Sequence, residues 1–414
     1  MTKRVLFPRK LSGQEATMKS SLTQVVGVIA LAAMSISPAA KAQNEKNEGC
    51  PAPQIVTFDA PHAGKGPGPA DCYNGCPGTE PYNNNIWGAV TGYVVEDGNY
   101  YHGFVRDPDG KITEFDAPGA SPAANYGTVA YSINGFGLIT GQYEDANAIF
   151  HGYVRWPNGN FDTFEAPDAG SGMFQGTIPL TINDTGEVAG YYIDSTGLPH
   201  GFERSRQGTI TEFDAPGAVN GTFTGGPSGS SLNVFGTVTG PYLDANNAFH
   251  GWLRAPDGSF VSPIDAPGAG TSAYQGTYPG AINNFGVVIG FFGDANGVSH
   301  GFIRYLNNTF ETLDVRGAGT AAGLGTVPVA NNDFGVVAGY TLDNNNVSHG
   351  FVRLPNGHTN VVDVKGAGSA NGQGTVFWEI NEIGASTGAY WDSNNVIHGF
   401  IRGPDFCDSK EGGR

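Results

Sequence analysis

From residue 54 onward, short apolar runs alternate with turn residues, and no run follows a helical period. Between residues 127 and 166 the β-prone pieces are 127–134, 138–145, 151–155 and 160–166. They are separated by Gly-Phe-Gly, Ala-Asn-Ala and Trp-Pro-Asn-Gly. Turns this short join antiparallel neighbours, so the pattern predicts a unit of four short antiparallel strands.

This unit repeats along the chain, and four elements mark the repeat. A His-Gly pair recurs at steps of 49 or 50 residues, beginning at His102, His151, His200, His250, His300, His349 and His398. A Gly-Thr pair begins at Gly78, Gly127, Gly176, Gly276, Gly325 and Gly374, with Gly226-Pro227 in the fourth position. An asparagine recurs at Asn85, Asn134, Asn183, Asn233, Asn283, Asn332 and Asn381. An acid recurs at Asp59, Asp116, Glu165, Asp214, Asp265, Asp314 and Asp363. Four-stranded units repeated at this period predict a β-propeller, whereas the alternative, a β-helix, would need shorter rungs.

The two ends of the repeat region complete one unit. Residues 54–59 form a fourth strand without its first three, and residues 398–402 form a third strand without its fourth. Joined, they leave no open sheet edge. We therefore predict an all-β fold in which residues 54–407 form a seven-bladed β-propeller. Each blade has four antiparallel strands, the N-terminal strand closes the ring, and the innermost strands lie near 78–85, 127–134 and their equivalents.

Two repeated elements carry a resemblance to a known family. Residues 151–155 read His-Gly-Tyr-Val-Arg, and residues 211–217 read Thr-Glu-Phe-Asp-Ala-Pro-Gly. They resemble the repeats of the bacterial extracellular HAF-repeat proteins over residues 54–407, although Gly follows His where the family name has Ala. The resemblance implies an exported repeat protein, and it implies no defined reaction and no catalytic residue.

The N-terminus resembles an export signal. Residues 25–37 form one apolar run after the basic Lys19, and this run is too short to span a bilayer. Ala40-Lys41-Ala42 fits a small-residue cleavage site. We predict a signal peptide over residues 1–42, starting at Met1 or Met18, a linker over 43–53 and a flexible tail over 408–414. The mature chain would be secreted or periplasmic in a bacterium; a short membrane anchor is the alternative.

Charge and cysteine content limit the partners. The net charge is −17, which disfavours nucleic acid and anionic membranes as partners, and we expect a monomer without membrane insertion. Four cysteines in an exported chain indicate two disulfides. Cys50 and Cys407 both leave the last blade at the edge where it lacks a turn, so we predict the pairs Cys50–Cys407 and Cys72–Cys76.

The repeated polar residues are interpreted as structural. A catalytic group is needed once, whereas the histidines occur in every unit, so we expect each to be half-buried and bonded to an acid, as His102 to Asp116. A second series of acids precedes the turn between second and third strands: Glu96, Asp145, Asp194, Asp244, Asp294, Asp343 and Asp392. Turn capping is the favoured role of these acids, and weak calcium binding is the alternative. No cofactor and no metal site are predicted. Ser386 lies in a Gly-x-Ser-x-Gly pattern, but the repeat places it in a strand.

The crossovers between units vary, and they carry the candidate ligand-binding residues. These are Tyr126, Phe174, Phe223, Tyr274, Gln175, Gln275 and Gln373. Aromatic rings beside amides and acids suit stacking on sugars with hydrogen bonds to their hydroxyls. The favoured function is a non-catalytic binding propeller for a glycan or cell-surface polymer, and packing between blades is the alternative role of these aromatic residues.

A polysaccharide lyase or hydrolase is the alternative function. Catalysis would need unrepeated charged residues that converge at one channel mouth. The candidates are His62, Lys65, His358, Arg316 and Lys365. Catalysis therefore stays open, with a binding protein favoured.

Overall fold

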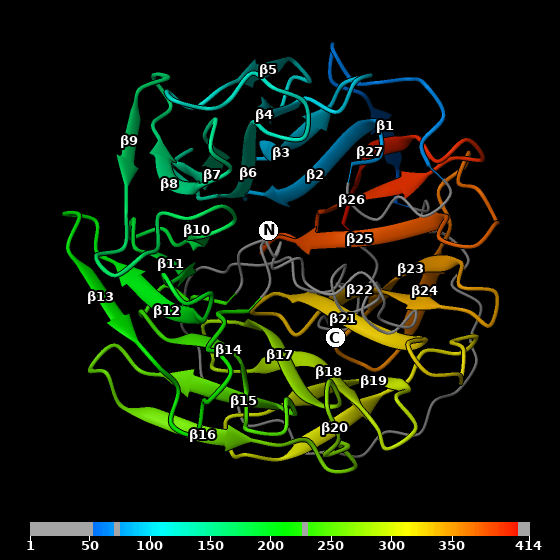
Figure 1. The fold of residues 1–414 in the computed structure, drawn as a ribbon. Helices are drawn as coiled ribbons and strands as arrows, with labels where there is room; N and C mark the ends of the chain where they lie inside the picture. The colour runs from blue at the N-terminus through cyan, green and yellow to red at the C-terminus, as the bar shows by residue number, and fades with distance from the viewer. Residues whose placement is uncertain (1–52, 70–74, 226–230, 405–414) are drawn as a thin grey trace, which may run out of the picture.

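The computed structural model describes residues 53–69, 75–225 and 231–404, and the regular secondary structure of these residues is entirely β-strand. Antiparallel groups of strands are arranged around a common centre (Figure 1), which is the architecture of a β-propeller. The predicted signal peptide, nearly all of the linker and the tail lie outside the described residues. None of the described residues forms a helix long and apolar enough to cross a membrane.

The strands follow the predicted order, with first, second, third and fourth strands joined by short turns. The first three groups are β2 (Gly78–Asn84), β3 (Val90–Val95), β4 (Tyr101–Arg106) and β5 (Ile112–Phe115); β6 (Thr128–Ile133), β7 (Ile139–Glu144), β8 (Phe150–Arg155) and β9 (Phe161–Phe164); and β10 (Gly176–Ile182), β11 (Val188–Ile193), β12 (Pro199–Arg204) and β13 (Ile210–Phe213). The fourth group contains β14 (Val238–Leu243), β15 (Phe249–Arg254) and β16 (Phe260–Ile264). The remaining groups are β17 (Gly276–Ile282), β18 (Val288–Gly293), β19 (Ser299–Arg304) and β20 (Phe310–Leu313); β21 (Gly325–Asn331), β22 (Val337–Leu342), β23 (Ser348–Arg353) and β24 (Thr359–Val362); and β25 (Gly374–Ile380), β26 (Ser386–Trp391) and β27 (Ile397–Arg402).

The fourth group departs from the prediction. In its described residues the first strand is replaced by two isolated bridges, Thr222 to Tyr242 and Leu232 to Val238. Gly226-Pro227 lie outside the described residues. The contacts of the Gly-Thr pair are made here by Gly221-Thr222, because Gly221 accepts a hydrogen bond from Leu243 just as Gly127 accepts one from Glu144. The 50-residue spacing did not point to this pair because extra residues separate it from Asn233.

The N-terminal strand joins the last group. β1 (Ile55–Phe58) pairs antiparallel with β27, in the register Ile55 to Arg402 and Phe58 to Gly399. β2 then begins beside the same strand through a parallel bridge from Gly78 to Ile397. The two ends of the repeat region therefore occupy one group.

Each first strand also begins on the group before it. Gly176 pairs with Phe150 in parallel, and Gly276 pairs with Phe249 in the same way. The threonine that follows the glycine accepts a hydrogen bond from the end of the preceding fourth strand, as from Ala166 N to Thr177 Oγ1 at 2.9 Å. The Gly-Thr pair is thus a joint between neighbouring groups.

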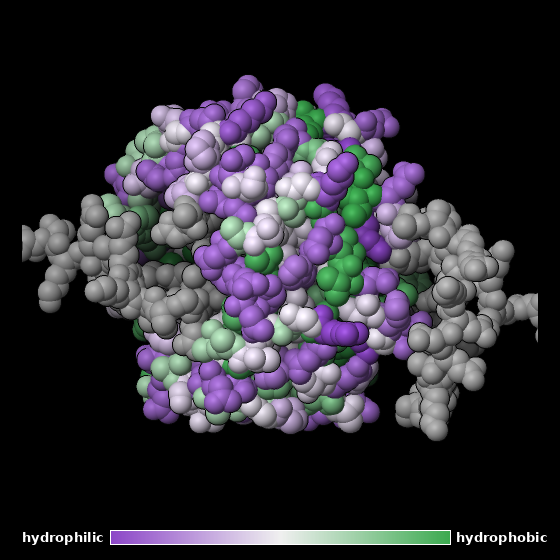
Figure 2. Space-filling model, turned by 90° about the vertical axis from the view of Figure 1, so that its right-hand side faces the viewer, coloured by the Kyte–Doolittle hydropathy of each residue, from purple (hydrophilic) through white to green (hydrophobic). Residues whose placement is uncertain are grey.

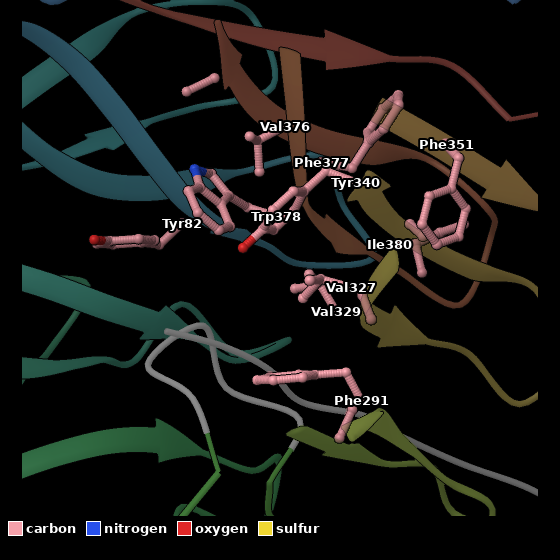
Figure 3. Close-up of a cluster of buried hydrophobic side chains, with 14 of the residues drawn as sticks. Tyr82, Phe291, Val327, Val329, Tyr340, Phe351, Val376, Phe377, Trp378 and Ile380 are labelled. Carbon is pink, nitrogen blue, oxygen red and sulfur yellow. The ribbon is translucent and has the colours of Figure 1, made fainter. Parts of the chain in front are cut away.

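The centre of the molecule is filled by apolar and aromatic side chains. Tyr82, Tyr340 and Trp378 come from three different groups and converge there, with ring centroids of Tyr82 and Tyr340 each 6.0 Å from that of Trp378 (Figure 3). Glu80 is buried among these rings and accepts a hydrogen bond from Trp378 Nε1 at 2.9 Å. Burial raises the pKa of Glu80 to about 7, although the hydrogen bond from Trp378 opposes the rise.

Candidate functional site

The asparagine that ends each first strand makes two sets of hydrogen bonds. Asn283 Oδ1 accepts from the backbone N–H groups of Phe285 and Val287, which closes the turn to the second strand. Its Nδ2 donates to the carbonyl of Asn332 in the next group at 3.1 Å. The asparagine therefore shapes its own turn and ties it to the neighbouring turn.

The same bond runs from group to group. The donor and acceptor pairs are Asn85 to Asn134, Asn134 to Asn183, Asn183 to Asn233, Asn233 to Asn283, Asn283 to Asn332, Asn332 to Asn381 and Asn381 to Asn85. This asparagine series returns to its first member. The series surrounds the centre at the ends of the first strands. In the sequence these asparagines were visible only as a repeated element, without an indicated role.

The turns after the asparagines carry exposed apolar side chains. We call the face formed by these turns and by the turns between third and fourth strands the inner-turn face. Six of the seven asparagines are followed, two residues later, by a large apolar residue. In the order of neighbouring groups these residues are Phe235, Phe285, Phe334, Ile383, Trp87 and Phe136. Their side chains are between 44% and 71% exposed. We call these six residues the apolar arc.

The turn itself does not require an apolar residue at this position. The equivalent in the third group is Thr185, which is exposed and whose backbone N–H bonds Asn183 Oδ1 like the others. Large exposed apolar side chains cost solvation without stabilising the turn, so their repetition indicates a contact surface.

Hollows open between the turns of this face. One of about 340 Å³ is lined by Phe334, Leu354, Ile383 and Pro404, with Glu382 as its charged group. Another of about 140 Å³ lies between the third and fourth groups, beside Glu203 and Leu232. A small polar hollow of about 20 Å³ lies within the asparagine series. The first has the size and the mostly apolar lining of a small-molecule site.

The arginines that end the third strands are buried or half-buried, whereas other basic residues are exposed: Lys65, Lys111, Arg206, Arg316 and Lys365. Four of the arginines that end third strands stack on a phenylalanine of the preceding group, as Arg204 on Phe164 at 4.6 Å and Arg155 on Phe115 at 4.4 Å. Arg304 and Arg402 are likewise buried. Seen from the side (Figure 2), the surface is largely hydrophilic, with apolar side chains gathered in one band. The arginines of the third strands therefore offer few cations to the solvent, and the exposed cations come from turns and crossovers.

The repeated histidines lie on the opposite face, which we call the crossover face. The expected pair is present, with His102 Nδ1 2.9 Å from Asp116 Oδ1. The other ring nitrogen faces the turn acid of the same group, as His200 Nε2 faces Asp194 at 3.7 Å. The hydrogen bond to Asp116 raises the pKa of His102, and the bond to Asp59 raises that of His398. Each histidine thus links two turns.

The second series of acids caps turns, as favoured above. Asp145 Oδ1 accepts hydrogen bonds from the backbone of Asn147 and Ile149 at 2.8 and 3.0 Å. Asp244 and Asp343 repeat this arrangement. Among the described residues, no group of three or more His, Cys, Asp and Glu side chains could hold a metal ion.

The predicted crossover aromatic residues do not form one cluster. Phe174 and Tyr274 are 45% and 38% exposed, each with a positive φ near 60°. Tyr126 is partly buried. Phe223 packs against Tyr191 at 5.5 Å, beside the central core, because its segment takes the place of a first strand.

The predicted crossover amides bond to the protein itself. Gln175 Oε1 accepts from Gly172 N and its Nε2 donates to the carbonyl of Ser195. Gln275 makes the equivalent bonds, and Gln373 bonds Ala370 N and Asn395. They therefore brace the crossovers, and the binding role assigned to them stays a prediction.

The two unrepeated histidines among the candidate catalytic residues lie on opposite faces, and Lys65, Arg316 and Lys365 are exposed at the crossovers. His62 follows β1 on the crossover face and pairs with Glu114. His358 lies in the turn before β24, on the inner-turn face, with its Nε2 3.0 Å from Asn360. These two histidines cannot act on one substrate group.

The predicted disulfides fall mainly outside the described residues. Cys50, Cys72 and Cys407 lie there, so the pairs Cys50–Cys407 and Cys72–Cys76 stay predictions. Cys76 is buried just before β2 and is disulfide-bonded.

The arrangement is similar to solved structures. The BP39L lectin from Burkholderia pseudomallei matches with a TM-score of 0.51 and 10% identity, over 77% of this chain and 95% of that one. A mutant of puromycin hydrolase matches with a TM-score of 0.50 and 11% identity, over 76% of this chain and half of that one. A six-bladed β-propeller lectin from Aleuria aurantia matches with a TM-score of 0.29, which carries no weight. No family model and no curated protein match the chain. One neighbour is a lectin and another a hydrolase, so fold alone does not decide function.

Proposed function

We propose that the chain is an exported, non-catalytic β-propeller that binds a glycan on its inner-turn face. The observation that carries the proposal is the apolar arc, together with the hollow between Phe334 and Ile383. Aromatic and aliphatic faces beside carboxylates and amides suit sugar rings, whose CH faces stack while their hydroxyls form hydrogen bonds. Binding of sugars by the neighbouring lectin fold agrees with this function.

The propeller has seven blades and is closed by the N-terminal strand. Pairing of β1 with β27 supports the closure. The asparagine series supports the count, because it passes through every group once and returns from Asn381 to Asn85. The fourth blade has an irregular innermost segment.

Binding without catalysis is favoured over the lyase or hydrolase alternative. The unrepeated histidines His62 and His358 lie on opposite faces, so they do not form one acid–base pair. The signal-like segment over residues 1–42 favours secretion from a bacterial cell. Glycan binding agrees with such an extracellular location.

A glycan array with residues 43–414 tests the function. Titration of the strongest hit with Phe334→Ala should show binding at least about fivefold weaker, since an aromatic contact contributes about 1 kcal/mol. Val361→Ala removes an exposed apolar side chain from the outer strand β24 and should bind like the unaltered protein. Loss of binding in Phe174→Ala, with Phe334→Ala unaffected, would move the site to the crossover face. Cleavage of the hit on incubation would favour the enzyme.

A further inference from the structure

We propose that the ligand is a polysaccharide without acidic groups that lies along several consecutive inner turns, rather than a terminal sugar held by one. This inference rests on the proposed function and names its substrate class. Three features carry it: the continuity of the apolar arc, the fixed spacing of its members and the distribution of charge.

The apolar arc is continuous across the chain ends. In neighbour order it runs from Phe235 to Ile383 and then, through the bond from Asn381 to Asn85, to Trp87 and Phe136. Thr185 alone interrupts the circle at this position. A site for one sugar needs one or two such side chains, whereas a run of equivalent positions matches the repeat of a polymer.

Neighbouring members are held in fixed relation. Each turn is closed by its asparagine, and each asparagine is bonded to the next turn, as Asn332 Nδ2 to Asn381 O at 3.1 Å. Trp87 adds a direct link, since its Nε1 donates to the carbonyl of Gly135 at 2.8 Å and its ring lies across the boundary between two groups. A rigid row loses little entropy when a polymer binds.

The charge along the apolar arc disfavours an acidic polymer. Asp184, Asp333 and Glu382 follow the asparagines of their groups, and each accepts a backbone hydrogen bond from the preceding group. Arg204 and Arg254, which end third strands at this face, are stacked on phenylalanines and buried, whereas Arg206, beside Gly186, and Lys111 are exposed cations of the third and first groups. Along the arc from Phe235 to Ile383, where the arginines that end the third strands are buried, uronate or sulfate groups would therefore meet carboxylates, whereas neutral sugars would meet acceptors for their hydroxyls.

Titration with oligosaccharides of increasing length tests the inference. The probes are cello-, manno- and chito-oligosaccharides from the single sugar to long oligomers, with oligouronates of equal length as the acidic series. Because linked contacts bind together, the longest oligomer of the preferred series should bind at least about tenfold more tightly than its single sugar. Phe285→Ala and Phe334→Ala should each weaken binding of the long oligomer and reduce its advantage over the short one.

A gain of function sharpens the test. Thr185→Phe fills the interruption and should strengthen binding of the long oligomer while leaving the single sugar unchanged. Equal affinity for single sugar and long oligomer, or preference for the oligouronates, would overturn the inference and leave glycan binding intact. Absence of binding to every glycan would instead overturn the proposed function.

Discussion

Asn283 shows what a single residue contributes to this fold. Its carboxamide bonds two N–H groups of its own turn and one carbonyl of the next. This position therefore needs an acceptor for the N–H groups of its own turn and a donor for the carbonyl of the next turn. Aspartate could supply only the acceptor because its side chain has no N–H to donate.

Replacement of Asn283 should therefore lower the free energy of unfolding more than replacement of an ordinary turn residue. Asn283→Ala removes these bonds and leaves buried backbone groups unpaired, so we expect a loss of about 2–3 kcal/mol in the free energy of unfolding. Asn158 is the matched control, since it is exposed and caps only its own turn at Asn160 N. Urea unfolding that gave equal losses for Asn283→Ala and Asn158→Ala would contradict the role of the asparagine series.

Glu80 makes stability depend on pH. Burial raises its pKa in the folded chain from 4.5 to about 7, so folding is disfavoured progressively as pH rises between these values. Glu80→Gln has no charge to bury. It should match the unaltered protein near pH 4 and exceed its unfolding free energy by on the order of 3 kcal/mol near pH 8. Asp109→Asn, at an exposed turn, should give no such difference. An equal difference in unfolding free energy between Glu80→Gln and the unaltered protein at both pH values would refute this explanation.

At the residue scale, the sequence predicted structure better than binding. One histidine per repeat indicated a structural role, and His102 bonds Asp116 as expected. The repeated asparagine was visible too, but its bond to the next group depends on neighbours about 49 residues away. The sequence did not predict the apolar arc, because Phe136 lies in a Gly-Phe-Gly segment that indicates only a turn between two strands. The exposure of these side chains, which indicates a contact surface, can be seen only in the folded structure.

At the scale of the strand, the Gly-Thr pair explains why each group begins on its neighbour. Gly276 has a φ of 109°, and a Cβ on it would lie 2.0 Å from the carbonyl oxygen of Phe249. Thr277 Oγ1 then accepts from Ala266 N at 2.8 Å. Turn residues set the strand boundaries closely, so β6 falls inside the predicted 127–134. The displaced pair Gly221-Thr222 could not be found by spacing, because insertion shifts the register.

A methyl group at this joint should be poorly tolerated. Gly276→Ala combines a positive φ with a backbone clash, and we expect a loss of at least about 3 kcal/mol in unfolding free energy. Gly280→Ala lies in the same strand, with its nearest atom at 3.9 Å, and should be nearly neutral. Thermal denaturation of the two variants compares them directly; similar melting temperatures would count against the joint.

At the scale of the whole molecule, two segments far apart in the sequence, β1 and β27, complete one group of strands. β1 supplies Asp59 to His398, at 2.9 Å, in the group completed by β27. The pairing of β1 with β27 was predicted from the sequence, because residues 54–59 match a fourth strand and residues 398–402 match a third strand. The sequence placed the candidate ligand-binding residues at the crossovers, whereas we propose the inner-turn face, because only the fold separates exposed from packed aromatic residues.

The bond between Asp59 and His398 should stabilise the protein more at acidic than at alkaline pH. Asp59 raises the pKa of His398 above 6.5 in the folded chain, so its stabilisation is present below that value and is lost as pH rises through the raised pKa. Asp59→Asn should lower the melting temperature more near pH 5 than near pH 9. An equal decrease at both values would show that the charge of His398 does not contribute.

The central claim is that a neutral glycan lies along the inner turns. Hydrogen–deuterium exchange of residues 43–414, with and without the tightest long oligomer, tests it most directly. We predict slower exchange at turns 233–237, 283–287, 332–336 and 381–385, with the crossovers around Phe174 and Tyr274 unchanged. Protection confined to those crossovers, with exposed inner turns unaffected, would contradict the claim.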